Sequence, residues 1–491
     1  MPPPRSGPVF VGIDIGTSSV KAVMGGAGGA LHDKYAGHHD TARPSAGAAE
    51  QNPADWMQHV EAALTRFAAH PRAGDVVAIG VTSQVNTHVF CDPARAPLHP
   101  AITWQDTRPA AQARRLDAAI SPEDKTTALG APIPIDASHA LARVGWMAAT
   151  NPEVWASTAH VMLPKDFAIA QLTGNCIADP ISAVGLVGTD LRYAPAILDL
   201  FAGAKTVLPM LRDPLEVAGH VRKDTPFAGV PVATGTMDAW AGMFGLGVAS
   251  EGEAIYLSGT SDVLGLISSD RPGAAGIITF PDWRGISLHA GPTQSGGASL
   301  VWLARILGQD VAALGRLAGQ AHITRQSPLF LPHLEGERAP LWDAGSRGAF
   351  AGMTSATGPE ELAACVMEGV AFSARLALEA IERSGNRQVH NLRHGGGGAA
   401  SDIWCQIRAN ALGRTLERVK VPEVGAMGAL VIAATAIGEL EDLGEATQGL
   451  VAIDRAFACD PKMAALADDR FKAFEDLYRA LGPVNATLQA P

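Results

Sequence analysis

Residues 9–24 read Val-Phe-Val-Gly-Ile-Asp-Ile-Gly-Thr-Ser-Ser-Val-Lys-Ala-Val-Met. The apolar, β-branched run from Val9 to Ile13 is typical of a short buried strand. Alternating apolar residues from Val20 to Met24 predict a second strand. The segment between them carries a carboxylate at Asp14 and a glycine at Gly16, followed by two hydroxyl side chains. The stretch therefore predicts a β-hairpin with a polar turn.

This turn has the chemistry of a phosphate-binding site. Gly16 lets backbone N–H groups approach an anion, the hydroxyls of Thr17 and Ser18 can donate to its oxygens, and Asp14 can hold a metal ion that neutralises it. It is not a Walker loop, which needs the pattern G-x-x-x-x-G-K-[ST] running into a helix. An ordinary hairpin with a Gly-Thr turn is the alternative interpretation.

Length and composition limit the class of protein. A chain of 491 residues exceeds the size at which single cores stop growing, about 250–300 residues, so we expect two domains of similar size. With 38 Lys+Arg against 49 Asp+Glu the chain is acidic, which argues against nucleic acid or an anionic membrane as a partner.

The five cysteines are scattered without a C-x-x-C pair, which argues against a disulfide framework or a zinc site. There is no signal-peptide pattern and no apolar window of about 18 residues, so the predicted location is cytoplasmic.

Further elements follow the hairpin. Asn52 as N-cap and the apolar spacing of the next residues predict a helix over 53–69, and a buried strand is expected over 76–81. A third strand is expected over 31–38, and the resulting β-β-β-α-β order predicts a mixed sheet with helices packed over it. The segment 89–102 is expected to form a further hairpin on that sheet.

The opening pattern recurs halfway along the chain. Residues 254–267 again show a strand, a turn at Gly259-Thr260-Ser261 and a second strand. The recurrence predicts two domains of similar topology, each presenting a hydroxyl-bearing hairpin to a shared cleft. Later, four glycines at 395–398 stand between a predicted strand and a helix, where close approach of another group would explain their entropic cost. A flexible linker is the alternative there.

These pieces resemble one family when taken together and in order. The matching segments are Gly12–Ser18, Gln84, Trp104–Arg108, Leu163–Asp166, Asp238, Tyr256–Ser261, Phe330–Arg338, Gly348–Met353 and Gly396–Ala399. The chain resembles the FGGY carbohydrate kinases over essentially its whole length, and the xylulose kinases most of all.

The resemblance implies an α/β fold of two similar ribonuclease-H-like (actin-like ATPase) domains, with mixed β-sheets flanked by helices and a cleft between the domains. The expected division is a flexible tail at 1–8, an N-terminal FGGY domain at 9–248 and a C-terminal one at 249–491. The first would bind sugar and carry the catalytic aspartate; the second would bind the adenosine of ATP.

The sequence departs from the xylulose kinase pattern at three places. It has Gln84-Val85-Asn86-Thr87 where those kinases typically carry Gln-Met-His-Gly. Ala239 follows the expected catalytic aspartate where Asn is frequent, and Arg143 stands where Lys is common. The first two changes lie where the resemblance puts the sugar.

The function implied is ATP-dependent phosphorylation of a small sugar hydroxyl, with a pentulose such as D-xylulose first. Another ketose, a polyol such as glycerol or a tetritol, or a sugar acid is the alternative, and a non-catalytic ATP-gated sugar-binding protein is a further one. Asp238 would be the general base that receives the hydroxyl proton, although an aspartate before a helix can also be a simple N-cap. The oligomeric state stays open, with a homodimer among the options.

The resemblance also assigns the remaining site residues. ATP would bind with Mg²⁺ held by Asp14 and Asp238, since magnesium favours one or two carboxylates plus phosphate oxygens. Amides suit vicinal diols because they both donate and accept. The expected sugar-binding residues are Gln84, Val85, Asn86, Trp104, Asp106 and Asp238. The expected ATP-binding residues are Thr17, Ser18, Lys21, Gly259, Thr260, Ser261, Gly297, Gly396, Gly397, Gly398, Ala399 and Asp402. For Lys21 a solvated strand lysine, for Trp104 core packing and for Asp402 helix capping are the competing roles.

Overall fold

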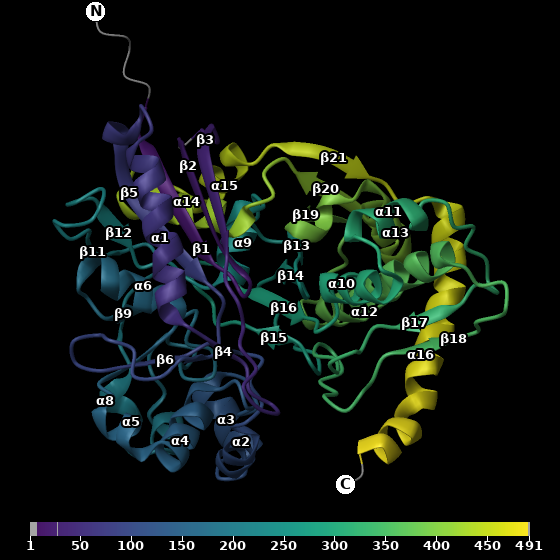
Figure 1. Ribbon diagram of the computed structural model, residues 1–491, viewed down its shortest axis with the longest axis horizontal. Coiled ribbons are helices and arrows are strands. Elements are labelled where there is room, and N and C mark those ends of the chain that lie inside the picture. Colours follow the sequence, from purple (N-terminus) through teal and green to yellow (C-terminus); the bar gives the residue numbers. More distant parts are fainter. Residues whose placement is uncertain (1–6, 27, 490–491) are drawn as a thin grey trace, which may run out of the picture. The chain divides into compact units, whose positions relative to one another are not determined.

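The computed structural model describes residues 7–26 and 28–489. Residues 1–6 of the predicted tail lie outside this part. Contacts between residues divide the chain into two compact units. Figure 1 shows the elements of the chain, coloured along the sequence. Unit 1 is Met1–Gly247 with Glu423–Leu450, and unit 2 is Val248–Pro422 with Val451–Pro491. This differs from the sequence-based division, which placed all of 249–491 in the second domain.

Unit 1 is built on a six-stranded mixed sheet in the order β11-β12-β5-β1-β2-β3. The predicted hairpin is confirmed: β1 pairs with β2 antiparallel, and Asp14 lies opposite Lys21. On its other side β1 pairs with β5 in parallel, and β5 pairs with β12 in parallel. The strands are β1 Val9–Ile15, β2 Ser19–Gly26, β3 Leu31–His38, β5 Val76–Ser83, β11 Val217–His220 and β12 Pro231–Ala233.

Helices cover both faces of this sheet. Alternate residues of β1, from Val9 to Ile15, pack with α1 and α6 in one apolar core. The intervening residues, such as Gly12, face α14, which packs on β1, β5 and α9. In Figure 1, α14 lies beside β1 although more than 400 residues separate them. These helices are α1 Pro53–Ala68, α6 Pro164–Thr173, α9 Asp238–Gly245 and α14 Val424–Ala436.

The predicted helix at 53–69 is confirmed as α1, with the Asn52 side chain accepting from the N–H of Ala54. The hairpin expected over 89–102 forms, since His88 pairs with Ile102 and Cys91 with Pro97 in antiparallel bridges, but its expected place on the main sheet is wrong. β6 pairs with β8, β7 pairs with β4, and none of the four joins the main sheet. Turn residues marked a reversal there, but the local pattern does not say which distant strand completes each pair. These strands are β4 Glu50–Gln51, β6 Val89–Cys91, β7 Ala101–Ile102 and β8 His160–Met162.

Residues of 110–117, 122–129, 140–150, 195–198 and 204–207 form a separate apolar core in unit 1. The rest of unit 1 consists of short elements. They are η1 Ala73–Asp75, α2 Ala110–Asp117, α3 Pro122–Leu129, α4 Ala140–Thr150, α5 Pro152–Ser157, β9 Ile177–Ala178, α7 Pro195–Leu198, α8 Ala204–Val207, β10 Met210–Leu211 and α15 Leu443–Leu450.

Unit 2 repeats the plan with a seven-stranded sheet in the order β15-β16-β14-β13-β19-β20-β21. Its strands are β13 Ala254–Ser258, β14 Asp262–Ile267, β15 Ile278–Thr279, β16 Leu288–Pro292, β19 Asn391–Gly395, β20 Thr415–Val419 and β21 Ile453–Phe457. Its other elements are α10 Gly297–Leu307, α11 Val311–Ala318, β17 Leu329–Leu331, β18 Ala349–Ala351, α12 Pro359–Ser384, η2 Gly397–Ala400, α13 Asp402–Leu412 and α16 Pro461–Gln489. α12 and α13 pack on the sheet through one apolar core.

The two sheets have equivalent order and direction. The antiparallel series β1-β2-β3 corresponds to β13-β14-β16, and the parallel pairs of β1 with β5 and β5 with β12 correspond to β13 with β19 and β19 with β20. The predicted duplication of topology is therefore confirmed.

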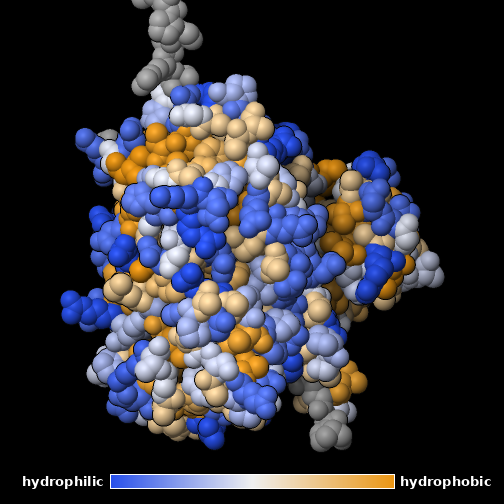
Figure 2. Space-filling view, turned by 60° about the vertical axis from the view of Figure 1, so that its left-hand side comes forward, coloured by the Kyte–Doolittle hydropathy of each residue, from blue (hydrophilic) through white to orange (hydrophobic). Residues whose placement is uncertain are grey.

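The surface mixes residue types. On the face shown in Figure 2, hydrophobic residues gather in separate patches among hydrophilic ones. No helix within residues 7–26 and 28–489 has the length and apolar character needed to cross a membrane.

Candidate active site

Three parallel strands of unit 1 end at the same edge of the sheet. β1 leads into Gly16 and Thr17, β5 leads into Gln84, and β12 leads into the segment 234–238. In open α/β sheets, ligands bind outside the carboxyl ends of the strands. The topology thus brings together residues that are more than 200 positions apart in the sequence.

The hairpin turn is fixed by its own backbone and by neighbours. The Gly16 N–H donates to the Ser19 carbonyl at 3.0 Å, which closes the hairpin. The Thr17 carbonyl accepts from Gln51 Nε2 at 2.6 Å, and the Ser18 carbonyl accepts from the N–H of His39 at 3.2 Å. Ser18 itself is exposed. The turn is held in one conformation before any ligand arrives.

Asp14 lies one residue before the end of β1, beside the first turn of α14. Its Oδ1 atom is buried and has no hydrogen-bond partner among the described residues. A Cβ on Gly425 would come within 2.4 Å of its Oδ2, so the helix backbone closes over the carboxylate. Burial raises the pKa of Asp14 to about 6, and the positive charge of Lys21 opposes this rise. An unsatisfied buried carboxylate oxygen is a suitable partner for a cation.

A chain of amide and hydroxyl contacts links the predicted sugar residues to this turn. Gln84 Nε2 donates to Gln51 Oε1 at 2.8 Å, and Gln51 in turn holds the Thr17 carbonyl. Trp104 Nε1 donates to Thr17 Oγ1 at 3.1 Å. The structure therefore brings Gln84, Trp104 and the turn into one group. Gln51 was missed because no motif marks it, and only the pairing of β4 with β7 places it there.

Two further features suit recognition of hydroxyl groups. Gln84 Oε1 is buried and has no partner within the described residues, which leaves an acceptor for a ligand hydroxyl. Asn86 adopts a left-handed backbone conformation with φ of 56°, and its Nδ2 donates to Ser138 Oγ at 3.2 Å. Val85 lies between them, half-buried.

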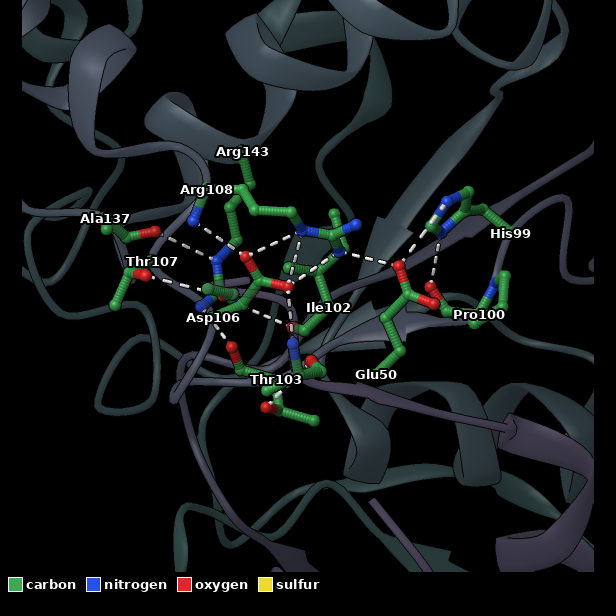
Figure 3. A network of polar contacts seen from close by, with 12 residues as sticks. Glu50, His99, Pro100, Ile102, Thr103, Asp106, Thr107, Arg108, Ala137 and Arg143 are labelled. Atoms are coloured by element: carbon green, nitrogen blue, oxygen red, sulfur yellow. Dashed lines mark hydrogen bonds and ion pairs between the residues drawn. The ribbon is translucent and has the colours of Figure 1, made fainter. Parts of the chain in front are cut away.

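Asp106 does not have the expected role. It is 1% exposed, and its Oδ2 accepts from the N–H of Ala49 at 2.9 Å and from Arg108 Nη2 at 2.7 Å. Its Oδ1 accepts from the backbone N–H and Nε of Arg108, and Arg108 also pairs with Glu50 at 2.6 Å (Figure 3). Because internal donors occupy both oxygens, the carboxylate holds the loop after β7 rather than a sugar hydroxyl.

The segment before Asp238 is anchored residue by residue. Lys165 Nζ donates to the Thr234 carbonyl at 3.1 Å, and the Thr236 carbonyl accepts from Thr82 Oγ1 at 2.6 Å. Gly235 has φ of +67°, and a Cβ there would lie 2.1 Å from the Val81 carbonyl oxygen. The segment therefore lies directly on the end of β5.

A cluster of buried charged side chains is hydrogen-bonded to this segment. Lys165, fully buried, pairs with Asp166 at 2.6 Å and with Asp179 at 3.1 Å. Asp179 Oδ1 also accepts from Thr236 Oγ1 at 2.9 Å. Burial alone would lower the pKa of Lys165, but the two carboxylates outweigh it and raise the pKa. The family resemblance included Leu163–Asp166 as a matching segment without indicating what Lys165 and Asp166 hold.

Asp238 is the first residue of α9 and half-buried. Met237, not Asp238, occupies the N-cap position, and Asp238 Oδ1 accepts from the N–H of Ala239 at 2.8 Å. The capping interpretation is thus not the geometry observed. A carboxylate at the first turn of a helix, held on an anchored segment at the sheet edge, can accept a proton from a ligand.

In unit 2 the second hydroxyl turn packs on α10. The N–H of Gly297 donates to the Gly259 carbonyl at 2.9 Å, and the N–H of Ala298 donates to the Thr260 carbonyl at 3.0 Å. The Gly297 N–H itself is thus taken within the protein, and the assignment of Gly297 to ATP binding stays a prediction. Gly259 and Thr260 are exposed, and Ser261 is half-buried.

The glycine loop after β19 contacts the same turn. A Cβ on Gly396, whose φ is +92°, would lie 2.4 Å from the Ser258 carbonyl oxygen, and one on Gly398 would lie 2.1 Å from Ser258 Oγ. Nothing lies within 4 Å of a Cβ built on Gly397, which is exposed. Ala399 is buried behind the loop. Close packing against Ser258 explains why Gly396 and Gly398 are glycines. The backbone of Gly397 is exposed and is not covered by a neighbouring residue.

A buried arginine ties the loop to the turn. Arg408 Nη1 donates to the Gly398 carbonyl at 3.1 Å, and Nη2 donates to Ser258 Oγ at 2.6 Å. Its guanidinium lies 3.7 Å from the centre of the Trp404 ring. Sequence reasoning missed Arg408, whose only signal is a charge on the inner face of α13.

Asp402 lies at the start of α13, where its carboxylate pairs with Arg418 at 2.6 Å and with Arg455 at 2.5 Å. Ser401 provides the helix cap by accepting from the N–H of Trp404, so the capping alternative for Asp402 is not the geometry observed. The expected contribution of Asp402 to ATP binding stays a prediction.

Known proteins resemble this chain over nearly its whole length. The model for the N-terminal domain of the FGGY family of carbohydrate kinases matches residues 9–245, and that for the C-terminal domain matches residues 257–437. The xylulose kinase of Escherichia coli (strain K12) is 28% identical over 97% of this chain and 100% of its own length. The glycerol kinase of Dechloromonas aromatica (strain RCB) is also 28% identical, over 97% of each chain.

A solved structure shares the fold. The ligand-bound xylulose kinase of Lactobacillus acidophilus superposes with a TM-score of 0.88 at 22% identity, covering 98% of this chain and 100% of that one. Both domain models match in order and together span most of the sequence. The chain belongs to the FGGY family of carbohydrate kinases.

Proposed function

We propose that the protein transfers the terminal phosphoryl group of ATP to a hydroxyl of a pentulose such as D-xylulose. One observation carries the proposal: the hairpin turn, Gln84 and the Asp238 segment follow three parallel strands that end at one edge of the unit 1 sheet. The xylulose kinases among the relatives support the choice of a pentulose.

Sugar binding is assigned to unit 1. Gln84 offers a buried acceptor, Asn86 an amide, and Trp104 an apolar ring whose Nε1 is already held by Thr17. Buried polar groups of this kind discriminate strongly, because a ligand without the matching hydroxyl leaves them unpaired. Val85 would contribute only shape.

Asp238 is assigned as the general base. It would accept the proton of the attacking hydroxyl as the oxygen bonds to the phosphorus and the bond from that phosphorus to ADP breaks. The anchoring of residues 234–237 limits its motion, and correct positioning is a large part of phosphoryl-transfer catalysis.

ATP is assigned to the glycine loop and hydroxyl turn of unit 2, with Gly397 as the open backbone for the adenosine, and to the turn at Thr17, Ser18 and Lys21 in unit 1. Asp14 fits a magnesium ion, since its Oδ1 is buried and unpartnered within the described residues. When bound with ATP, magnesium would neutralise phosphate charge. Asp238 is the second proposed ligand. A cytoplasmic location and a homodimer stay predictions.

Turnover of a substrate panel tests the reaction and its substrate. ATP consumption with Mg²⁺ would be measured against pentuloses, other ketoses, glycerol, tetritols and sugar acids. We expect the highest kcat/KM for a pentulose. A preference for glycerol would favour the similarity to glycerol kinase instead, and absence of turnover with retained ATP binding would favour a binding protein.

The variant Asp238→Asn tests the base. We expect kcat to fall by roughly 10²–10⁴-fold, the range for loss of a general base, while binding of ATP changes little. Asp199→Asn, which removes an exposed carboxylate paired with Lys205, is the matched control and should leave kcat unchanged. Retained turnover in Asp238→Asn would exclude the base role.

A further inference from the structure

Arg143, on α4, lies fully buried and contacts three separate segments (Figure 3). Its Nη1 donates to the Asn86 carbonyl at 2.5 Å and to the Ile102 carbonyl. Its Nη2 donates to the Thr103 carbonyl at 2.5 Å, and its Nε donates to the Ala137 carbonyl at 3.2 Å. A single side chain thus fixes backbone from three loops.

The partners of this guanidinium are unusual for a buried charge. Besides the carbonyls, Nη1 lies 3.3 Å from Nδ1 of His88, and among the described residues no carboxylate accepts a hydrogen bond from this guanidinium. Burial lowers the pKa of Arg143 to about 9, against the more distant charges of Asp106 and Asp136. Burying a charge is costly unless its donors are satisfied, and here backbone carbonyls satisfy them.

The segments that Arg143 holds carry the proposed sugar-reading side chains. The first contains Asn86 itself, whose left-handed backbone has φ of 56°. The second ends at Thr103, directly before Trp104. The third contains Ala137, directly before Ser138, which accepts from the Asn86 amide at 3.2 Å. The backbone of both Asn86 and Trp104 is therefore set by one guanidinium.

We propose that Arg143 is a positioning residue that determines sugar selectivity by fixing the backbone of Asn86 and of the segment leading to Trp104. This rests on the proposed function, in which those side chains read the sugar. A lysine, common at this position in the xylulose kinase pattern, would hold these segments less completely, because an ammonium is a point charge with three donors whereas the planar guanidinium offers five in fixed directions. The side chain acts without touching the sugar.

The variant Arg143→Lys tests the proposal. Loss of one or two charge-assisted hydrogen bonds changes an equilibrium by roughly 10- to 100-fold, so we expect KM for the sugar to rise at least tenfold. The ratio of kcat/KM between the best sugar and its nearest competitor should fall, while KM for ATP stays within about twofold. A merely structural role would lower thermal stability without separating the two KM values.

Arg470→Lys is the matched control. Arg470 is also buried and donates to Glu368 and to the Pro328 carbonyl, but it lies in unit 2. The variant Arg470→Lys should be less stable than the wild type but should keep the same sugar preference. If both variants alter sugar KM equally, or if Arg143→Lys alters neither the sugar KM nor the preference, the proposal is wrong.

Ser138→Ala keeps the proposal testable if Arg143→Lys does not fold. Ser138 is only half-buried, so its loss should not prevent folding. Because it frees the Asn86 amide, we expect a change in sugar preference at unchanged KM for ATP, and an unaltered preference would count against the assigned role of Asn86. Turnover of the sugar panel by the wild type separates failure of the proposed function from failure of the positioning role. If the wild type turns over no sugar, the proposed function is contradicted. If it turns over a sugar and the variants behave like the wild type, only the positioning role of Arg143 is contradicted.

Discussion

His394 links the stability of unit 2 to pH. It lies fully buried on β19, where its Nδ1 contacts the Tyr256 carbonyl at 2.8 Å and its Nε2 lies 3.3 Å from Arg408 Nη1. Burial, with a further contribution from the charge of Arg408, lowers the pKa of His394 to about 3. The imidazole is therefore neutral in the folded protein, with Nδ1 as donor and Nε2 as acceptor.

Because the folded pKa lies below the unfolded value near 6.5, the unfolded chain binds a proton that the folded one does not. Stability is full above pH 6.5 and is lost as pH falls toward 3. We expect the wild type to lose about 2 kcal/mol from this residue between pH 7.5 and 5.0. In His394→Asn, whose amide can still donate to the Tyr256 carbonyl, this part of the loss should disappear. Urea unfolding at the two pH values measures it, and an equal pH dependence in both proteins would contradict the assignment.

At the scale of elements, α14 packs on the elements that carry Asp14, the proposed metal ligand, and Asp238, the proposed base. A Cβ on Gly428 would lie 1.6 Å from the Ala241 carbonyl oxygen of α9, and one on Gly245 of α9 would lie 1.9 Å from the Val424 carbonyl oxygen. The same helix closes over Asp14 through Gly425. Glycines at these positions let the two helix backbones touch, so the position of Asp238 at the start of α9 depends on α14.

The variant Gly428→Ala should separate these helices. Overpacking a filled core typically costs 1–3 kcal/mol, and backbone cannot move as easily as a side chain, so we expect a loss of at least about 2 kcal/mol. Turnover should fall as well, since α9 shifts. Gly449→Ala, on α15 with nothing within 4 Å of its Cβ, is the control and should leave stability equal or slightly higher. Thermal unfolding followed by circular dichroism, with kcat alongside, distinguishes the two.

At the scale of the whole molecule, unit 1 depends on a segment from the far end of the chain. Apart from Thr435 and Ala436, every residue of α14 is buried. A helix that is apolar all round needs cover on all sides, and the sheet strands β1 and β5 with α9 provide it. Neither half of the sequence contains all of the core of unit 1.

A shortened protein tests this dependence. Residues 1–247 alone should aggregate or unfold without cooperativity, because the face of the sheet that α14 covers becomes exposed. Residues 1–247 joined by a long Gly/Ser linker to 423–450 should recover a cooperative thermal transition. Equal cooperativity and equal midpoints for the two proteins would show that α14 is dispensable for the fold of unit 1.

The outcome for individual residues shows which sequence signals were reliable. The turn at 16–18 and Gln84 were found because they end strands with strong apolar patterns. Asp106 was assigned to the sugar from a family motif and Asp402 to ATP from its place near the glycine loop, but their arginine partners lie two to fifty-three residues away in the sequence. Gln51, Arg408 and Lys165 as supports could not be predicted, since their roles depend on which segments become neighbours.

The sequence by itself determined the elements, the duplicated topology and the family, because strand periodicity, turn residues and ordered motifs are local properties. Only the tertiary structure decided that 423–450 completes unit 1, that Gly297 and Asp106 serve internal contacts, and that one arginine holds Asn86 and the strand end before Trp104. The physical reason is that a buried polar or backbone group takes whichever partner packing brings within about 3 Å, and that partner is set by the fold as a whole.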